Sequence, residues 1–416
     1  MIELKGKNGT TKVFTNNVEQ EAISQIIKIL NNPISENTTI RIMPDVHAGK
    51  GCTIGTTILL PKNKKEWKIC PNVIGVDIFC GVIAVKINNK ITQQDLAKLD
   101  TVINLFVPSG FNVHNSQTKD IESKVQNLIN NVSFKLKDEG RIINSMASLG
   151  GGNHFIEMGV DSNGSHWILI HSGSRNFGKQ IAEHHQKIAE QQFKGISRDV
   201  HEKMIAKLKS EGRQSEIKSE ITKLKNSLPK TDKGLEYLTG ELASNYISDM
   251  MIAQEYGKLN REEMINIIVE KMGWNIVDSF DSAHNFIDRI TINKHYEENR
   301  YIIRKGATGA TLNERLIIPL NMRDGSLICI GKGNEDWNYS APHGAGRLMS
   351  RSQAKRELNM QDFKDAMEGI YTTSVVNSTL DEAPDAYKNA QEIIDNIKDT
   401  VEIIEHLKPV YNYKSH

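Results

Sequence analysis

Residues 339–347 read YSAPHGAGR, and they decide how the rest of this 416-residue chain is interpreted. Pro342 fixes φ and removes a backbone donor just before His343, and the glycines that follow allow the backbone to approach a ligand closely. The imidazole can thus be held at a charged group whose oxygens meet bare N–H groups and Arg347. A glycine turn beside a buried structural histidine explains the same letters, because short glycine motifs are weak signals alone. Other sequence motifs along the chain decide between a ligand-binding histidine and a structural one.

The composition indicates a globular protein with a hydrophobic core, since 38% of the residues are hydrophobic and 25% are charged. The formal net charge is +1, so a polyanion would have to bind a local basic patch. The four cysteines form no Cys-x-x-Cys pair, which argues against a disulfide framework and predicts a reducing, cytoplasmic location. We see no signal peptide and no run of the ~18 apolar residues that a membrane span needs.

Hydrophobic periodicity predicts both helices and strands. A first helix is predicted where apolar residues recur from Val18 to Leu30, before Pro33 stops it, and Thr92 with Asp95 predicts a capped helix start. The predicted strands cover residues 56–60, 82–87, 301–304 and 316–319. Residues 155–160 and 166–171, which flank Asn163-Gly164, predict a hairpin.

The segment from about residue 175 to 272 differs in composition, being dense in Lys, Glu and Gln. One helical face in it carries Ile217, Ile221, Leu224 and Leu228. This pattern predicts a solvated helical insert, an arm that projects from the body. A final helix is predicted from the apolar residues that run from Ala390 to Ile404, ending before Pro409. No internal repeat or low-complexity linker marks a domain boundary.

Several histidines share a glycine-rich setting that suggests a metal site. They are His47 in PDVHAGKG, His154 in GGGNHFIE, His171 in HSGSR, and His284, which precedes Asn285. Asp77 and Cys80 stand in GVDIFCG, where a thiolate can bridge two cations and a carboxylate can bind one of them. Together with imidazoles these groups suit a two-metal site that polarises phosphate oxygens. Each residue taken alone is more simply a structural histidine or a small buried cysteine.

Four arginines predict a phosphate-rich substrate, because they stand beside glycines or hydroxyls in separate blocks. They are Arg175, Arg304, Arg347 and Arg351. If these blocks converge in the fold, their guanidinium groups and backbone amides would hold phosphates. Ordinary solvated charges are the simpler interpretation of each one singly.

Taken together, these blocks resemble the RtcB family of RNA-splicing ligases. The matching stretches are DVHAGKGCTIG at 45–55, GVDIFCG at 75–81, LGGGNHFIE at 149–157, HSGSRNFG at 171–178, AHN at 283–285, RKGAT at 304–308, SAPHGAGRLMSR at 340–351 and DEAPDAYK at 381–388. They follow the family's order over almost the whole chain. The set is specific, although each stretch alone is weak.

The resemblance implies an enzyme that uses GTP and two manganese ions to join RNA ending in a 3′-phosphate or 2′,3′-cyclic phosphate to RNA beginning with a 5′-hydroxyl. His343 would be the guanylylated residue. Asp77 and His154 would bind one ion, His171 and His284 the other, and Cys80 would bridge them. Zinc suits the same ligands equally by their chemistry alone, so manganese comes only from the family.

The family's nucleotide contacts carry over to seventeen positions. They are Asn153, His154, Phe155, Ile156, Glu157, His284, Asn285, Pro319, Leu320, Asn321, Met322, Ser326, His343, Gly344, Ala345, Gly346 and Lys414. Lys414 would contact the guanine, provided that residues 410–413 dock as a short strand. Two departures stand out. Phe79 replaces a usual glycine, and residues 319–322 read PLNM in place of PGSM.

The fold that the resemblance implies is an α/β (α+β) body over residues 1–416, with central β-structure and the helical projection. The implied partners are GTP and RNA with broken ends, such as tRNA. The protein is expected to be a monomer and to have no membrane partner. Two alternatives remain: a metal-dependent phosphoesterase that hydrolyses RNA ends, and a non-catalytic RNA-binding homologue. A covalent guanylate would exclude the first, and a lack of bound manganese would favour the second.

Overall fold

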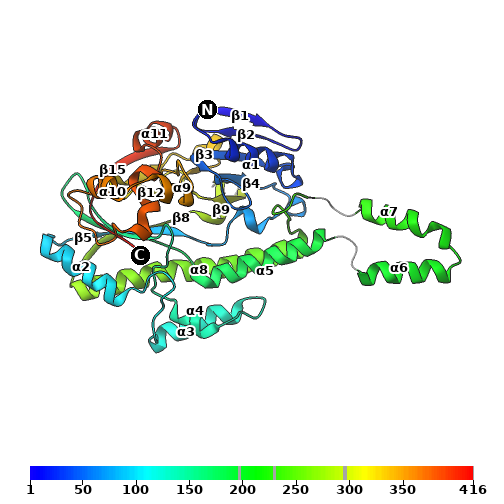
Figure 1. Ribbon diagram of the computed structural model, residues 1–416, viewed down its shortest axis with the longest axis horizontal. Coiled ribbons are helices and arrows are strands. Elements are labelled where there is room, and N and C mark those ends of the chain that lie inside the picture. The colour runs from blue at the N-terminus through cyan, green and yellow to red at the C-terminus, as the bar shows by residue number, and fades with distance from the viewer. Residues whose placement is uncertain (195–197, 228–230, 294–297, 416) are drawn as a thin grey trace.

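Two β-sheets form the centre of the molecule in a computed structural model that describes residues 1–194, 198–227, 231–293 and 298–415 (Figure 1). In the six-stranded sheet the order is β1 (Ile2–Lys5), β2 (Thr10–Val13), β3 (Thr39–His47), β4 (Ile54–Leu59), β10 (Glu298–Lys305) and β9 (Asn285–Asn293). Only β2 and β3 pair in parallel in this sheet. The alternating helices and strands give a mixed α/β fold, as predicted.

The second sheet has seven antiparallel strands and curls on itself, because its edge strands β12 and β8 also contact each other. Its order is β12 (Arg315–Asn321), β13 (Gly325–Gly331), β15 (Val401–Lys414), β6 (Phe155–Val160), β7 (His166–Ser172), β5 (Gly81–Ile87) and β8 (Ile276–Ala283). A small two-stranded sheet pairs β11 (Ala307–Gly309) with β14 (Ser340–Pro342). This short pair delivers His343 directly after β14.

The helices surround the sheets. They are α1 (Gln20–Asn31), α2 (Gln93–Phe106), α3 (Lys119–Asn131), α4 (Glu139–Asn144), α5 (Arg175–Phe193), α6 (Arg198–Ser210), α7 (Ile217–Ser227), α8 (Gly240–Met272), α9 (Arg351–Glu357), α10 (Met360–Ala366) and α11 (Ala390–Asn396). Short 3-10 helices cover Pro33–Ser35, Lys64–Glu66, Pro71–Val73, Gln214–Glu216, Glu335–Trp337, Asn377–Glu382 and Pro384–Ala386. Among the described residues no helix is both long and apolar enough to cross a membrane.

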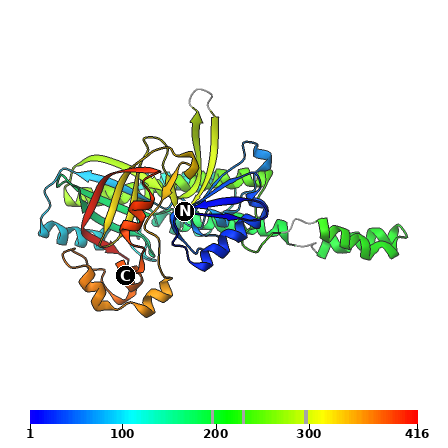
Figure 2. The same ribbon diagram turned by 90° about the horizontal axis from the view of Figure 1, so that it is seen from above.

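The predicted helical insert divides into two parts with different surroundings. Helices α6 and α7 lie side by side away from the body, as the predicted arm (Figures 1 and 2). Helices α5 and α8 instead pack against each other, and α8 buries Tyr246, Met250 and Tyr256 at helical spacing. The prediction that the whole insert is solvated is therefore wrong for α5 and α8. Leu228 and the side chain of Leu224 lie outside the described residues.

The local signals for strands, caps and the hairpin are confirmed. Helix α1 begins at Gln20 and ends before Pro33, and Thr92 forms a capping box with Asp95 at the start of α2. Strands β6 and β7 pair in register around the turn that contains Gly164, whose φ of 77° suits glycine. Strands β4, β5, β10 and β12 cover the other four predicted runs.

The predicted final helix is wrong beyond residue 396. Helix α11 ends at Asn396, and the chain then enters β15, which pairs with β13 and then with β6. Val401 and Ile404 match a helical period, but pairing between two strands overrides that local preference. Pro409 stands at a register irregularity, where a missing N–H is tolerated. The same strand carries residues 410–414 onto the body, which confirms the predicted docking of the C-terminal segment.

Candidate active site

His343 is held by a buried carboxylate. Its Nδ1 lies 2.7 Å from Oδ2 of Asp45, and its backbone N–H donates to the same oxygen. Asp45 is fully buried on β3, whereas the His343 side chain is 15% exposed. Because Nδ1–H donates to Asp45, Nε2 carries the free lone pair. Gly306 packs beside the imidazole with a φ of 59°, and a Cβ there would clash with the Ile54 side chain and come 3.1 Å from the His343 ring, so the position favours glycine.

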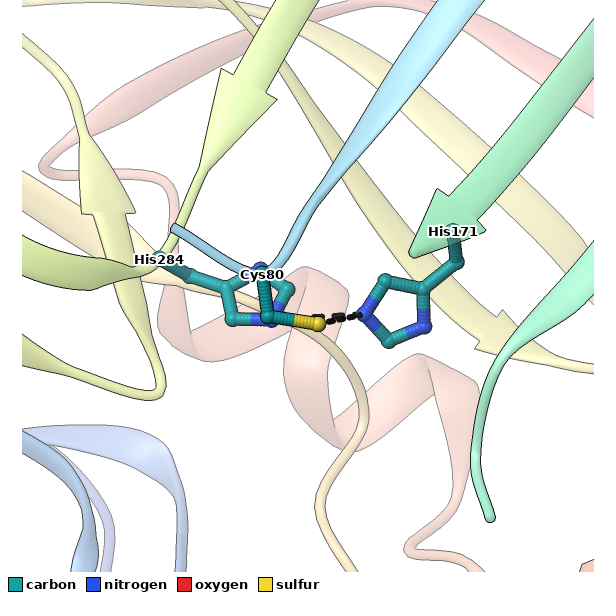
Figure 3. A group of neighbouring side chains, drawn as sticks. All are labelled: Cys80, His171 and His284. Carbon is teal, nitrogen blue, oxygen red and sulfur yellow. Dashed lines mark hydrogen bonds between the residues drawn. The ribbon is translucent and has the colours of Figure 1, made fainter. Parts of the chain in front are cut away.

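Five side chains next to His343 form what we call the Cys80 cluster: Asp77, Cys80, His154, His171 and His284. They make two groups that share Cys80, one with His171 and His284 and the other with Asp77 and His154. Within each group the donor atoms lie within 4.8 Å of one another. Figure 3 shows Cys80, the residue directly before β5, pointing its sulfur at the His171 ring, 3.1 Å from Nε2. The His284 ring lies 4.7 Å from the His343 ring, centroid to centroid.

The Cys80 cluster is rich in acceptors and poor in donors. The Nδ1 atoms of His154 and His171 donate to the carbonyls of Leu149 and Asn153, so both Nε2 atoms present lone pairs to the centre. Nε2 of His154 lies 3.0 Å from Oδ2 of Asp77 and 3.4 Å from Sγ of Cys80. Nε2 of His171 lies 3.1 Å from the same sulfur. A thiol proton can serve only one of these acceptors. Shared cations would satisfy all of them, so the residues present fit metal ions.

Burial sets the protonation of this cluster. It lowers the pKa of His171 and of His284 well below the ordinary value, which keeps both imidazoles neutral and able to bind a metal. Burial also raises the pKa of the Cys80 thiol well above its ordinary value. A cation would have to displace that proton, so metal binding at Cys80 should release a proton.

Phe79, the residue that replaces a usual glycine, adopts a φ of 57°, in the left-handed region that favours glycine. The surrounding structure holds it there. Its N–H donates to the carbonyl of Asn285, and its carbonyl accepts from the fully buried Arg261. The ring packs on that guanidinium and edge-on to Phe286. These contacts accommodate the bulky side chain and the left-handed backbone of Phe79 beside Cys80.

A cavity of about 440 Å³ opens beside His343, and we call it the His343 cavity. Thirteen predicted site residues line it, namely Asn153, Phe155, Glu157, His171, Pro319, Leu320, Asn321, Met322, His343, Gly344, Ala345, Gly346 and Lys414. The PLNM segment lies at the end of β12 and forms part of this wall, and Asn321 is held there by Asp324. The volume is within the range of small-molecule sites.

One end of the His343 cavity carries a network of buried charges. Glu157 accepts hydrogen bonds from Ser326 and Asn412, and burial raises its pKa to about 7. Lys414 is nearly buried, donates to Glu382 at 2.6 Å and lies over the Phe155 ring. Burial opposes the charge on Glu382, but Lys414 and Arg351 lower its pKa to about 2. Lys414 is therefore fixed at the cavity rather than frayed at the chain end.

Some predicted contacts lie outside the lining of the His343 cavity. Ile156 points to the opposite face of β6 and packs in the core. Ser326 lies behind Glu157, and Asn285 links the Asp77 carbonyl to the Gly306 amide. His154 and His284 belong to the Cys80 cluster. These residues support the walls of the site from behind.

The four predicted phosphate-binding arginines do not converge. Arg304 is fully buried, pairs with Asp288 and donates to Ser340, so the prediction that it contacts phosphate is wrong. Arg347 and Arg351 both line the His343 cavity and both pair with Glu382. Arg175 lines a different cavity, on the other side of the Cys80 cluster.

Three supporting residues were missed by sequence reasoning. Asp45 stands in the block DVHAG and Glu382 in the block DEAPDAYK. Both blocks were recognised in the sequence, but no function was predicted for either residue. Arg261 had no local signal. It comes from α8, where a buried guanidinium pairs with Asp281 and donates to carbonyls beside the Cys80 cluster.

The fold and the site define a class: mixed α/β proteins in which a carboxylate-held histidine stands between a cavity and a potential metal cluster. A family model described as tRNA-splicing ligase RtcB matches residues 25–415, so the chain belongs to the RtcB family. It is 28% identical to the RNA-splicing ligase RtcB of Escherichia coli strain K12, over 98% of each chain. It is also 27% identical to the tRNA-splicing ligase RtcB of Aeropyrum pernix, over 85% of this chain and 82% of that protein. These relatives support an RNA ligase.

Proposed function

We propose that this protein is a GTP- and manganese-dependent ligase that joins RNA 3′-phosphate or 2′,3′-cyclic phosphate ends to 5′-hydroxyl ends through a guanylylated His343. The supporting observation is the position of His343. It lines a cavity of nucleotide size, its Nδ1 is held by Asp45, and its ring stands next to the Cys80 cluster. RNA with broken ends, such as cleaved tRNA, is the substrate class, in line with the names of the relatives.

In the first step Nε2 of His343 attacks the α-phosphorus of GTP. An N–P bond forms, the bond to the β-phosphate oxygen breaks, and pyrophosphate leaves. The imidazole gains positive charge while its Nδ1–H still donates to Asp45, so the carboxylate stabilises that charge and fixes the tautomer. The glycines that follow His343 leave space for the phosphate to approach the ring.

In the second step an oxygen of the RNA 3′-phosphate attacks the same phosphorus, which breaks the N–P bond and returns His343 to its neutral form. The 5′-hydroxyl oxygen of the other RNA then attacks the 3′-terminal phosphorus and loses its proton to solvent, the P–O bond between that phosphorus and the guanylate breaks, and GMP leaves. In this proposal Glu157 and Lys414 bind the guanine, which is supported by the carboxyl of the one and the ammonium of the other at the same end of the cavity. Covalent catalysis of this kind divides one difficult transfer into easier ones.

Asp77, Cys80, His154, His171 and His284 would hold two manganese ions, with Cys80 shared. Bound there, the ions would neutralise phosphate charge and align the reacting oxygens. A ligand set with a carboxylate beside sulfur and imidazole is compatible with manganese and also with zinc.

Ligation of two short RNAs tests the proposal. One ends in a 3′-phosphate, the other begins with a 5′-hydroxyl, and the joined product is followed with GTP or with ATP in the presence of manganese. The expected product forms with GTP and is lost in His343→Ala, while the exposed His406→Ala control retains it. Release of inorganic phosphate without any joined strand would indicate the phosphoesterase alternative instead.

A further inference from the structure

A second cavity, of about 500 Å³, opens on the other side of the Cys80 cluster, and we call it the Phe111 cavity. Asp77 and His154 form the part of its wall that belongs to the cluster. Asn153 lines both cavities, so the two meet at this residue. A group bound in the Phe111 cavity would therefore face the cluster from the side opposite to His343.

The Phe111 cavity is basic. Arg141, Arg175 and Lys179 line it, against the single carboxylate of Asp77. Helix α5 begins at Arg175, the side chain of its N-cap Ser174 accepts no hydrogen bond from the first-turn amides, and its first turn has no acidic residue. Cations at a helix N-terminus are disfavoured by the helix dipole unless an anion is bound there. The cavity as a whole therefore suits a group that carries phosphate.

Phe111 gives this cavity an aromatic surface. Its side chain is 92% exposed, which is unusual for so large an apolar group. The turn that carries it is nevertheless fastened to the site. Gly110 donates to the carbonyl of Gly150, and Arg141 donates to the carbonyl of Phe111 at 2.7 Å. A ring presented to water by a fixed backbone, next to cations, is the arrangement that proteins use to stack a base of a single strand.

We propose that the Phe111 cavity binds the terminal nucleotide of a single-stranded RNA end, with its base on Phe111 and its backbone phosphates on Arg141 and Lys179. The inference rests on the proposed function and deepens it by giving the RNA its own site, apart from the guanylate. The cation set and the ring together fit RNA better than an acidic peptide, which would need no aromatic surface. The terminal nucleotide would reach the Cys80 cluster past Asp77 and Asn153.

RNA binding measured without GTP tests the site separately from ligation. Fluorescence anisotropy follows two short RNAs labelled at their far ends, one ending in a 3′-phosphate and one beginning with a 5′-hydroxyl, so the two kinds of end are distinguished. Phe111→Ala should weaken the binding of at least one of them by about 5- to 150-fold, the range expected for one lost stacking contact. Phe111→Trp should keep the wild-type affinity that Phe111→Ala loses, and that RNA should quench the fluorescence of the introduced indole. Leu105→Ala, which changes a 70% exposed apolar residue outside the cavity, should have no effect.

Charge provides a second readout. Arg141→Gln should reduce the slope of log affinity against log salt by about 0.7, the value for one phosphate contact with a single strand. Unchanged affinity for both RNAs in Phe111→Ala, or equal competition by a poly-glutamate peptide in both wild type and Phe111→Ala, would overturn the inference. Failure of the proposed function would instead appear as a lack of guanylylation while the RNA affinities still depended on Phe111.

Discussion

The His343 cavity and the Phe111 cavity both border the Cys80 cluster but are built differently. The first is walled by a glycine segment and by buried charges that are already paired, such as Lys414 with Glu382. The second presents cations and an exposed phenylalanine to water. Paired, buried groups select one small molecule by shape and hydrogen bonds, whereas exposed cations and a ring accept many sequences. The difference fits a protein that takes one nucleotide and a variety of RNA ends.

The largest effect is expected in the Cys80 cluster, which supplies wall residues to both cavities. Cys80→Ser should remove most bound metal, because both donor groups use the thiolate and a hydroxyl is a poorer bridging ligand. Elemental analysis of the purified protein measures this directly. Cys329→Ser, a buried cysteine on β13 away from the cluster, is the matched control and should keep its metal. Full metal content in Cys80→Ser would refute the shared ligand.

Asp45→Asn should impair the reaction in the His343 cavity and leave RNA binding in the Phe111 cavity unchanged. Loss of the carboxylate that orients His343 should slow guanylylation by at least about 100-fold, as with other imidazoles deprived of their orienting acid. RNA affinity should stay unchanged, because Asp45 does not line the Phe111 cavity. The rate of label transfer from GTP is the measurement, with the partly exposed Asp278→Asn as control. A wild-type rate in Asp45→Asn would show that His343 needs no such support.

Lys414→Met should narrow the preference for GTP over ATP by about tenfold, the value of one lost charge-assisted hydrogen bond. Guanine presents an oxygen where adenine presents an amino group, and the ammonium is fixed at the cavity by Glu382. Competition between the two nucleotides during guanylylation gives the ratio. The control is Lys408→Met, an exposed lysine on the same strand. An unchanged ratio would leave Lys414 with only a structural role.

The last effect concerns stability rather than activity, and it depends on pH through Glu157. Burial raises its pKa from 4.5 to about 7, so the folded protein holds this proton more tightly than the unfolded chain. The resulting stabilisation is complete below pH 4.5 and is lost as the pH rises through 7, a change of up to about 3 kcal/mol. Glu157→Gln should lack this loss, so urea unfolding should favour the variant increasingly towards alkaline pH. The exposed Glu402→Gln on the same sheet should track the wild type, and parallel curves for wild type and Glu157→Gln would contradict the burial argument.

Structural features that depend on residues close in sequence could be predicted, whereas features that depend on contacts between distant residues could not. The capping box at Thr92 and the hairpin around Gly164 depend on neighbours in the sequence, so both were predictable. Strand β15 was mistaken for helix at its start because its partners β13 and β6 are distant in sequence. Arg304 illustrates the same limit at the site, since only the fold reveals that Asp288 and Ser340 bury its charge.

The residues of the Cys80 cluster were predictable as a set because each stands in a recognised block. Their convergence on one centre, and the carbonyls that fix the two Nε2 lone pairs, required the structure. In the Phe111 cavity, Asp77, His154 and Arg175 stood in recognised blocks, but the ring of Phe111 and the cation Arg141 had no sequence signal. Its ring, its cations and its helix start come from segments that become neighbours only in the fold.

The central claim is that His343 carries the guanylate, and peptide mapping tests it most directly. The protein is incubated with manganese and GTP labelled at the α-phosphate, digested at alkaline pH to preserve an N–P bond, and analysed by mass spectrometry. We predict the mass of one guanylate on the peptide that contains His343, linked through Nε2, and no labelled peptide from His343→Ala. A guanylate on any other residue, or ligation by wild type with no labelled peptide under conditions that preserve the bond, would contradict the account.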